Sequence, residues 1–150
     1  MHCQIHAMLA TAVVVVAIAA TAISAPAAYS YGIMQSSCAP WDGPAIAITL
    51  TSEPTQCKRT SEPFISMGVW RGLPIKAGQV VKFGPGSDAG FASRCKKEGD
   101  CERAQSGEIR FDRYEEGSGA AGHFELHFKG DDVMKGAFDV KWCQERSICG

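Results

Sequence analysis

Charged residues are missing from the start of the chain, where no Lys, Arg, Asp or Glu precedes Asp42. From Ala7 to Ile23 the sequence is apolar apart from two threonines, and small residues follow, including Ala25-Pro26-Ala27. An apolar run followed by an A-x-A pattern is typical of a secretory signal peptide. We therefore expect residues 1–25 to be an export signal, cleaved between Ala22 and Ser30.

Basic residues are also missing from the first six positions, where an export signal normally carries Lys or Arg. The alternative is an uncleaved membrane anchor, since the run of Ala7 to Ile23 is near the lower limit for crossing a bilayer. No basic cluster follows the run to stop transfer, which favours the cleaved signal. Contact with a membrane is expected only if this segment stays attached.

The chain has no excess of either charge, with 15 basic and 16 acidic residues among its 150. Neutralisation of phosphates supplies most of the affinity of nucleic-acid-binding proteins, which therefore carry a basic surplus. This balance excludes DNA and RNA as expected partners. The length suits one domain with its own core.

Recognisable catalytic and cofactor motifs are lacking. There is no Gly-x-Ser-x-Gly elbow for a nucleophile, and Gly84-Pro85-Gly86-Ser87 lacks the lysine of a phosphate-binding loop. The paired acids Glu115-Glu116 and Asp131-Asp132 lie in predicted turns, where solvated carboxylates are the usual finding. We expect no enzyme activity, no cofactor and no resident metal.

A metal-dependent enzyme is the minor alternative. His123 and His127 lie on one face of a predicted strand, about 13 Å apart, so neither could hold an ion without a neighbouring Glu125 or Asp139. The favoured interpretation of this face is a solvated surface whose opposite charges pair across strands.

Seven cysteines are present, and Cys3 falls in the predicted signal. An even number of cysteines in a short exported chain indicates a set of disulfides, because oxidising compartments let such bonds persist. The short spacings from Cys95 to Cys101 and from Cys143 to Cys149 favour two local bonds, and Cys38 would then pair with Cys57 by elimination. A bond from Cys38 to one of the last two cysteines is the rival. The six residues are Cys38, Cys57, Cys95, Cys101, Cys143 and Cys149.

No segment after the signal shows a sustained helical period, whereas alternating apolar residues are frequent. The alternation predicts strands at 45–51, 64–70 and 79–83. The segment 26–44 is interpreted as an N-terminal arm that precedes a β domain at 45–150. The polar stretch 87–106 is interpreted as a long loop, ordered either by a short helix near 91–94 or by a disulfide.

The last third of the chain gives the clearest pattern, with alternating runs at 109–111, 124–128 and 138–142 separated by glycine-rich turns. Short connections of this kind join antiparallel strands. The fold class is therefore all-β: a small antiparallel barrel, closed with six to eight strands, or a two-layer sandwich, with a C-terminal meander and disulfides. The meander's apolar face is Ile109, Phe111, Phe124, Leu126, Phe128, Phe138, Val140 and Trp142.

Four residues are candidates for binding. Trp41 is flanked by prolines and close to Cys38, so it is either a pre-ordered recognition residue or a plug for one end of the barrel. Trp70 lies at a predicted strand end, and Lys96 and Lys97 lie in the loop that Cys95 and Cys101 enclose.

The layout of signal, short β domain and three disulfides resembles small exported inhibitors and calycin-like binding proteins, which implies a binding role. We expect a secreted or periplasmic binding protein. Its ligand is either a protein, bound in the manner of an inhibitor, or a small apolar molecule in an interior lined by Phe124, Phe128, Phe138 and Trp142. The alternative is a structural, envelope-associated protein.

Overall fold

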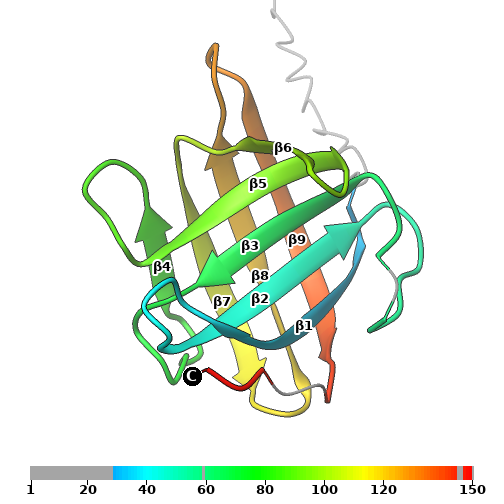
Figure 1. The fold of residues 1–150 in the computed structure, drawn as a ribbon, viewed down its shortest axis with the longest axis vertical. Helices are drawn as coiled ribbons and strands as arrows, with labels where there is room; N and C mark the ends of the chain where they lie inside the picture. The colour runs from blue at the N-terminus through cyan, green and yellow to red at the C-terminus, as the bar shows by residue number, and fades with distance from the viewer. Residues whose placement is uncertain (1–28, 59, 145–146, 150) are drawn as a thin grey trace, which may run out of the picture.

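The computed structural model describes residues 29–58, 60–144 and 147–149 and shows an all-β protein with no helix among them. Nine strands form a single sheet (Figure 1). They are β1 (Tyr31–Cys38), β2 (Pro44–Thr51), β3 (Phe64–Val69), β4 (Val80–Phe83), β5 (Gly90–Lys97), β6 (Asp100–Arg103), β7 (Ser106–Glu115), β8 (Gly119–His127) and β9 (Val133–Trp142).

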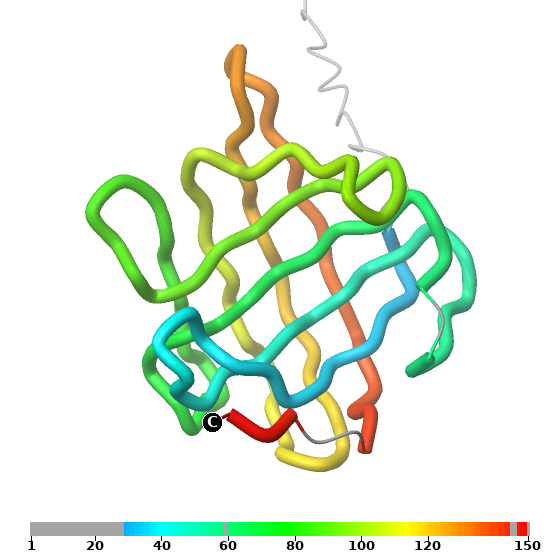
Figure 2. Tube along the Cα trace, viewed as in Figure 1, coloured from blue at the N-terminus to red at the C-terminus, as the bar shows by residue number. Residues whose placement is uncertain are grey.

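The strand order is β4-β7-β8-β9-β1-β2-β3-β5-β6, and the sheet curls so that β7, β8 and β9 lie behind β1, β2, β3 and β5 (Figures 1 and 2). The predicted C-terminal meander is confirmed as the β7–β8–β9 run. One pair is parallel, with Ile33 of β1 opposite Lys141 of β9. The expectation of a closed barrel with six to eight strands was wrong, because there are nine strands and the sheet does not close.

The core fills the inside of the curled sheet. Met34, Ile48 and Met67 alternate with outward-facing residues and are fully buried, as strand alternation requires. The predicted apolar face of the meander is confirmed: seven of its eight members are buried and Trp142 is partly buried against them.

Three phenylalanine rings inside the sheet fill the space beside a glycine on the neighbouring strand. The opposed pairs are Phe83 with Gly107, Phe124 with Gly136, and Phe138 with Gly122. A Cβ atom on Gly136 would lie 2.7 Å from the Phe124 ring, and one on Gly122 would lie 2.9 Å from the Phe138 ring. Each ring lies over bare backbone, an arrangement that pins strand register.

Two parts of the sequence prediction need correction. β1 falls inside the segment 26–44 that we interpreted as an arm, and it is a central strand paired with both β2 and β9. The stretch 87–106 is neither a loop nor a short helix, since it contains the β5–β6 hairpin, with Ser93 opposite Arg103. These strands lack a clean period-two apolar pattern, because β1 contains Gln35-Ser36-Ser37 and β5 ends in Arg94-Cys95-Lys96-Lys97.

Three disulfides are present and fit an oxidising, extracellular environment. The predicted local bond Cys95–Cys101 is confirmed and links the two strands of the β5–β6 hairpin. The predicted pairs Cys143–Cys149 and Cys38–Cys57 were wrong. Cys38 binds Cys149, as the rival pairing proposed, and Cys57 binds Cys143. Sequence spacing predicted the wrong pairs because the C-terminal segment folds back, which brings Cys149 to β1 and Cys143 to the β2–β3 loop.

The segment predicted to be an export signal, residues 1–25, lies outside the described residues. Within the part of the chain that is described, no helix has the length and apolar character needed to span a bilayer.

Candidate functional site

The outer face of the front half of the sheet is uncharged. β1, β2 and β3 contain no Lys, Arg, Asp, Glu or His. Their outward positions carry small or neutral side chains such as Gln35, Thr49 and Ser66, and Ser93 of β5 continues the face next to Ser66. We call the outward side of these four strands the neutral face.

The outer face of the meander differs sharply, because it carries a dense set of charges. Its pairs include Arg113–Asp139 at 2.8 Å, His123–Asp112 at 2.8 Å and Lys135–Glu125 at 2.8 Å. The Lys135 ammonium, through its hydrogen bond, lowers the pKa of the Glu125 carboxyl. The surface of this one sheet is thus divided into a charged half and a neutral half.

An aromatic cluster of Trp41, Trp70 and Phe91 lies at one end of the neutral face. Phe91 is opposite Gly68, the outward residue of β3 that precedes Trp70 by two positions. The rings of Trp70 and Phe91 are 5.3 Å apart, and Trp41 from the β1–β2 turn stands edge-on to Trp70 at 6.0 Å. Trp41 is 44% exposed, so it packs outside the sheet and does not plug the barrel.

The cluster has an arginine at each end. The Arg71 guanidinium lies 4.3 Å from the Trp41 ring centre, and that of Arg103 lies 5.8 Å from the Phe91 ring centre. Arg71 also donates to the Asp88 carboxylate at 2.5 Å, a hydrogen bond that lowers the pKa of Asp88. Asp88 thereby holds the Arg71 guanidinium over the Trp41 ring, within the range of a cation–π interaction.

The structure separates the four residues that the sequence proposed for binding. Trp41 and Trp70 are in contact, as described. Lys96 and Lys97 are exposed at the far end of β5, about 16 Å along the strand from Phe91. Lys96 sits at a bulge opposite β6, next to the Cys95–Cys101 disulfide. They therefore belong to the rim of the neutral face and not to the aromatic cluster.

Sequence analysis missed Phe91, Arg71 and Arg103, which complete the cluster. Phe91 stands in a segment that we interpreted as a loop, so its pairing with β3 was not foreseen. Its alternation with Ser93 and Cys95 was the available signal for a strand with an outward face.

The side chains of the metal hypothesis are not brought together. His123 pairs with Asp112, His127 pairs with Glu125, and Asp139 pairs with Arg113. No group of three or more His, Cys, Asp or Glu among the described residues is placed to hold an ion. The first and third of these pairs join different strands, whereas His127 and Glu125 both lie on β8.

The phenylalanines proposed to line an interior ligand site are packed into the core. Phe124, Phe128 and Phe138 are each at most 5% exposed, and Phe138 stacks edge-on to Phe111 at 5.9 Å. Trp142 alone of the four residues reaches a surface cleft, at the lower end of the sheet.

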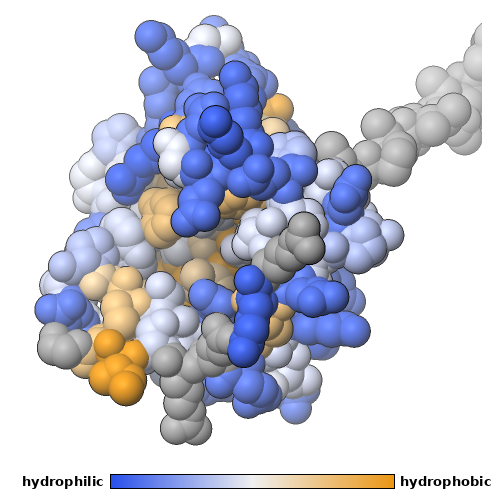
Figure 3. All heavy atoms as spheres, turned by 45° about the vertical axis from the view of Figure 1, so that its right-hand side comes forward, coloured by the Kyte–Doolittle hydropathy of each residue, from blue (hydrophilic) through white to orange (hydrophobic). Residues whose placement is uncertain are grey.

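The space-filling view in Figure 3 shows hydrophilic side chains gathered at the upper end of the molecule. Hydrophobic atoms come to the surface in a hollow near the middle of that view.

No protein-family model, curated protein or solved structure matches the chain.

Proposed function

We propose that this protein is an exported binding module whose partner is another protein, docked on the neutral face and anchored by the aromatic cluster. The observation that carries the proposal is the set of contacting rings Trp41, Trp70 and Phe91 between two arginines, at one end of the neutral face.

The residue types support a protein partner. Trp and Arg dominate the energetically important positions of protein interfaces, whereas charged residues are depleted at interface centres. The neutral face meets both conditions, since its strands β1 to β3 have no charged residue and the cluster borders it. The outer face of the meander fails the second condition, because it is dense in charge.

The cluster is also pre-organised, which lowers the entropic cost of binding. Trp41 is in contact on three sides. Trp70 packs edge-on against it and the Arg71 guanidinium covers its ring. The third contact is the Gly43 backbone, which lies so close that a Cβ atom there would be 2.6 Å from the Trp41 Nε1 atom. The turn that carries Trp41 is closed by a hydrogen bond from the Ala39 amide to the Gly43 carbonyl at 2.8 Å.

An inhibitor-like mode through the β5–β6 hairpin is a narrower form of the same proposal. The disulfide would hold Lys96 and Lys97 in place at the rim while the neutral face makes the larger contact. The finer assignment of compartment, secreted or periplasmic, follows from the predicted export signal together with the disulfides.

Differential capture from the source organism's exported proteins tests the proposal. Tagged mature protein is compared with Trp41→Ala and with Arg113→Ala, a matched change on the charged face. We expect a partner that binds the wild type and Arg113→Ala and whose retention falls at least about tenfold with Trp41→Ala. A partner lost with Arg113→Ala but kept by Trp41→Ala would overturn the proposal.

A further inference from the structure

A cleft of about 400 Å³ opens at the lower end of the sheet, and none of its lining residues belongs to the aromatic cluster. It lies where β1 and β9 end, where β2 begins and where the chain leaves β7. Such a volume is within the range of small-molecule sites, which favour the mouths of barrel-like sheets.

Aromatic rings form the inner wall of the cleft. Tyr114 and Trp142 stack edge-on at 6.4 Å, and Tyr114 in turn packs edge-on against Phe111 of the core at 6.3 Å. Burial raises the pKa of the Tyr114 phenol, with the nearby Glu116 carboxylate adding to the effect. Tyr114 is thus partly buried against the core at this side of the wall.

The rest of the lining combines aliphatic side chains with three serines (Ser36, Ser37 and Ser147) and one charge. Pro44, Ile46 and Leu73 contribute aliphatic surface. Among the described residues that line the cleft, Glu116 alone carries a formal charge. A carboxylate here repels anionic ligands and tolerates neutral or cationic ones.

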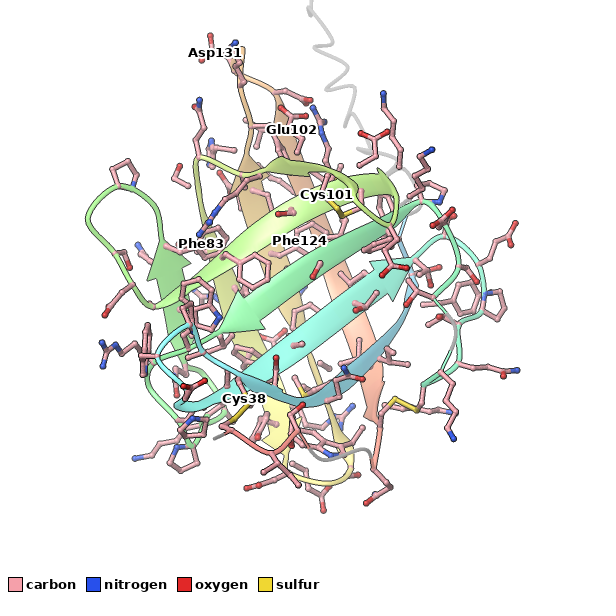
Figure 4. All side chains as sticks on the ribbon, viewed as in Figure 1. Cys38, Phe83, Cys101, Glu102, Phe124 and Asp131 are labelled. Carbon is pink, nitrogen blue, oxygen red and sulfur yellow. A yellow bond between two sulfur atoms is a disulfide. The ribbon has the colours of Figure 1, made fainter. Side chains whose placement is uncertain are left out.

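The end of the chain borders the cleft. The Ser147 hydroxyl donates to the Ser36 carbonyl at 2.9 Å, and Cys149 is bonded to Cys38. Figure 4 shows this disulfide at the lower end, where the tail runs beneath β1. The covalent bond gives the cleft a fixed outer wall, which a pre-formed ligand site requires.

We infer that the cleft lined by Tyr114 and Trp142 is a binding site for a small, flat apolar molecule that is neutral or cationic. This site goes beyond the proposed protein-binding function and shares no residue with the aromatic cluster. It differs from the interior site expected from the sequence, because Phe124, Phe128 and Phe138 fill that interior and the cleft lies at the end of the sheet.

The test uses two fluorescent probes that differ in charge, neutral N-phenyl-1-naphthylamine and the anionic anilinonaphthalene sulfonate. We expect the mature protein to bind the neutral probe at least about tenfold more tightly than the anion, and Glu116→Gln to narrow that gap severalfold. Ser36→Phe, which fills the cleft and keeps the backbone bond to Ser147, should weaken the neutral probe at least about tenfold.

A second readout does not depend on the folding of the Ser36→Phe variant. In the double variant Trp41→Phe and Trp70→Phe, Trp142 is the remaining tryptophan, and the neutral probe should quench its emission. That variant also removes the tryptophans of the protein-binding surface, so the two proposals fail separately. Absence of quenching, or equal binding of the probe by wild type and folded Ser36→Phe, would overturn the inference.

Discussion

The Phe91 ring lies directly over Gly68, so that a Cβ atom at position 68 would overlap the ring. Phe91 then leans against Trp70, whose indole would lie 3.2 Å from the same atom. The absence of a side chain at Gly68 of β3 thus leaves the space that the Phe91 ring of the outer aromatic cluster occupies. It repeats on the outer face what Phe83, Phe124 and Phe138 do on the inner face.

Gly68→Ala should therefore destabilise the protein by about 1–3 kcal/mol through overpacking and displace the Phe91 ring. Urea unfolding measures the stability change, and near-ultraviolet circular dichroism reports the tryptophans. Ser66→Ala, on the same strand and face, is the matched control and should change neither signal. An unchanged unfolding midpoint for Gly68→Ala would contradict the packing.

The three disulfides should differ in their contributions. Cys38–Cys149 and Cys57–Cys143 span 111 and 86 residues, whereas Cys95–Cys101 spans six. Chain-entropy arguments give about 5 kcal/mol for each long bond and about 2 kcal/mol for the short one. Denaturant unfolding of the paired serine variants Cys38→Ser/Cys149→Ser and Cys95→Ser/Cys101→Ser tests this order. Equal losses would count against the long-range pairing.

Arg94 joins the β5–β6 hairpin to the β8–β9 loop. Its guanidinium contacts Glu102 at 2.6 Å and Asp132 at 2.5 Å and lies 4.3 Å from the Phe128 ring centre. Figure 4 labels Glu102 and Asp131, the residue before Asp132, both toward the upper end of the molecule.

Arg94→Met should speed amide hydrogen exchange in β6 and cost about 1 kcal/mol, a modest figure because the pair is partly solvated. Arg113→Met, which removes an exposed arginine paired with Asp139, is the control. Exchange in β6 that matches the wild type would show that Arg94 does not hold the hairpin.

The Lys135–Glu125 pair gives a pH prediction. The pKa of Glu125 is lowered in the folded protein, first through its hydrogen bond with Lys135, so the pair stabilises the fold above the ordinary carboxyl pKa. That contribution is lost as the pH falls through the lowered folded value. In Lys135→Met the carboxyl titration followed by NMR should move upward. Lys141→Met serves as control, and an unmoved Glu125 titration in Lys135→Met would refute the assignment.

The sequence predicted the parts of the fold whose information is local. The period-two pattern of Phe124, Leu126 and Phe128 was enough to find a strand and its buried face. The pairing of Cys38 with Cys149 could not be predicted in the same way, because it depends on β1 lying beside β9 in three dimensions. The number of residues between two cysteines does not indicate which distant strands lie side by side.

The candidate site shows the same division. Trp41 and Trp70 stood out from the sequence as aromatic residues beside prolines and glycine, but their contact joins a turn to a strand end. Phe91 and Arg103 enter the cluster only because β5 pairs with β3 on one side and β6 on the other, and Arg71 enters it because the β1–β2 turn brings the Trp41 ring beside its guanidinium. From the sequence, Lys96 and Lys97 were equally good candidates for binding. They lie outside the cluster because they are at the opposite end of β5 from Phe91.

Site-specific photo-cross-linking tests the central claim, that the neutral face binds a protein. A photoreactive phenylalanine analogue is placed at Ser66 on the neutral face or at Arg113 on the charged face, and the protein is illuminated in the cells that export it. We predict a discrete cross-linked protein from position 66 and none from position 113. Cross-linking from position 113 with none from position 66 would contradict the claim.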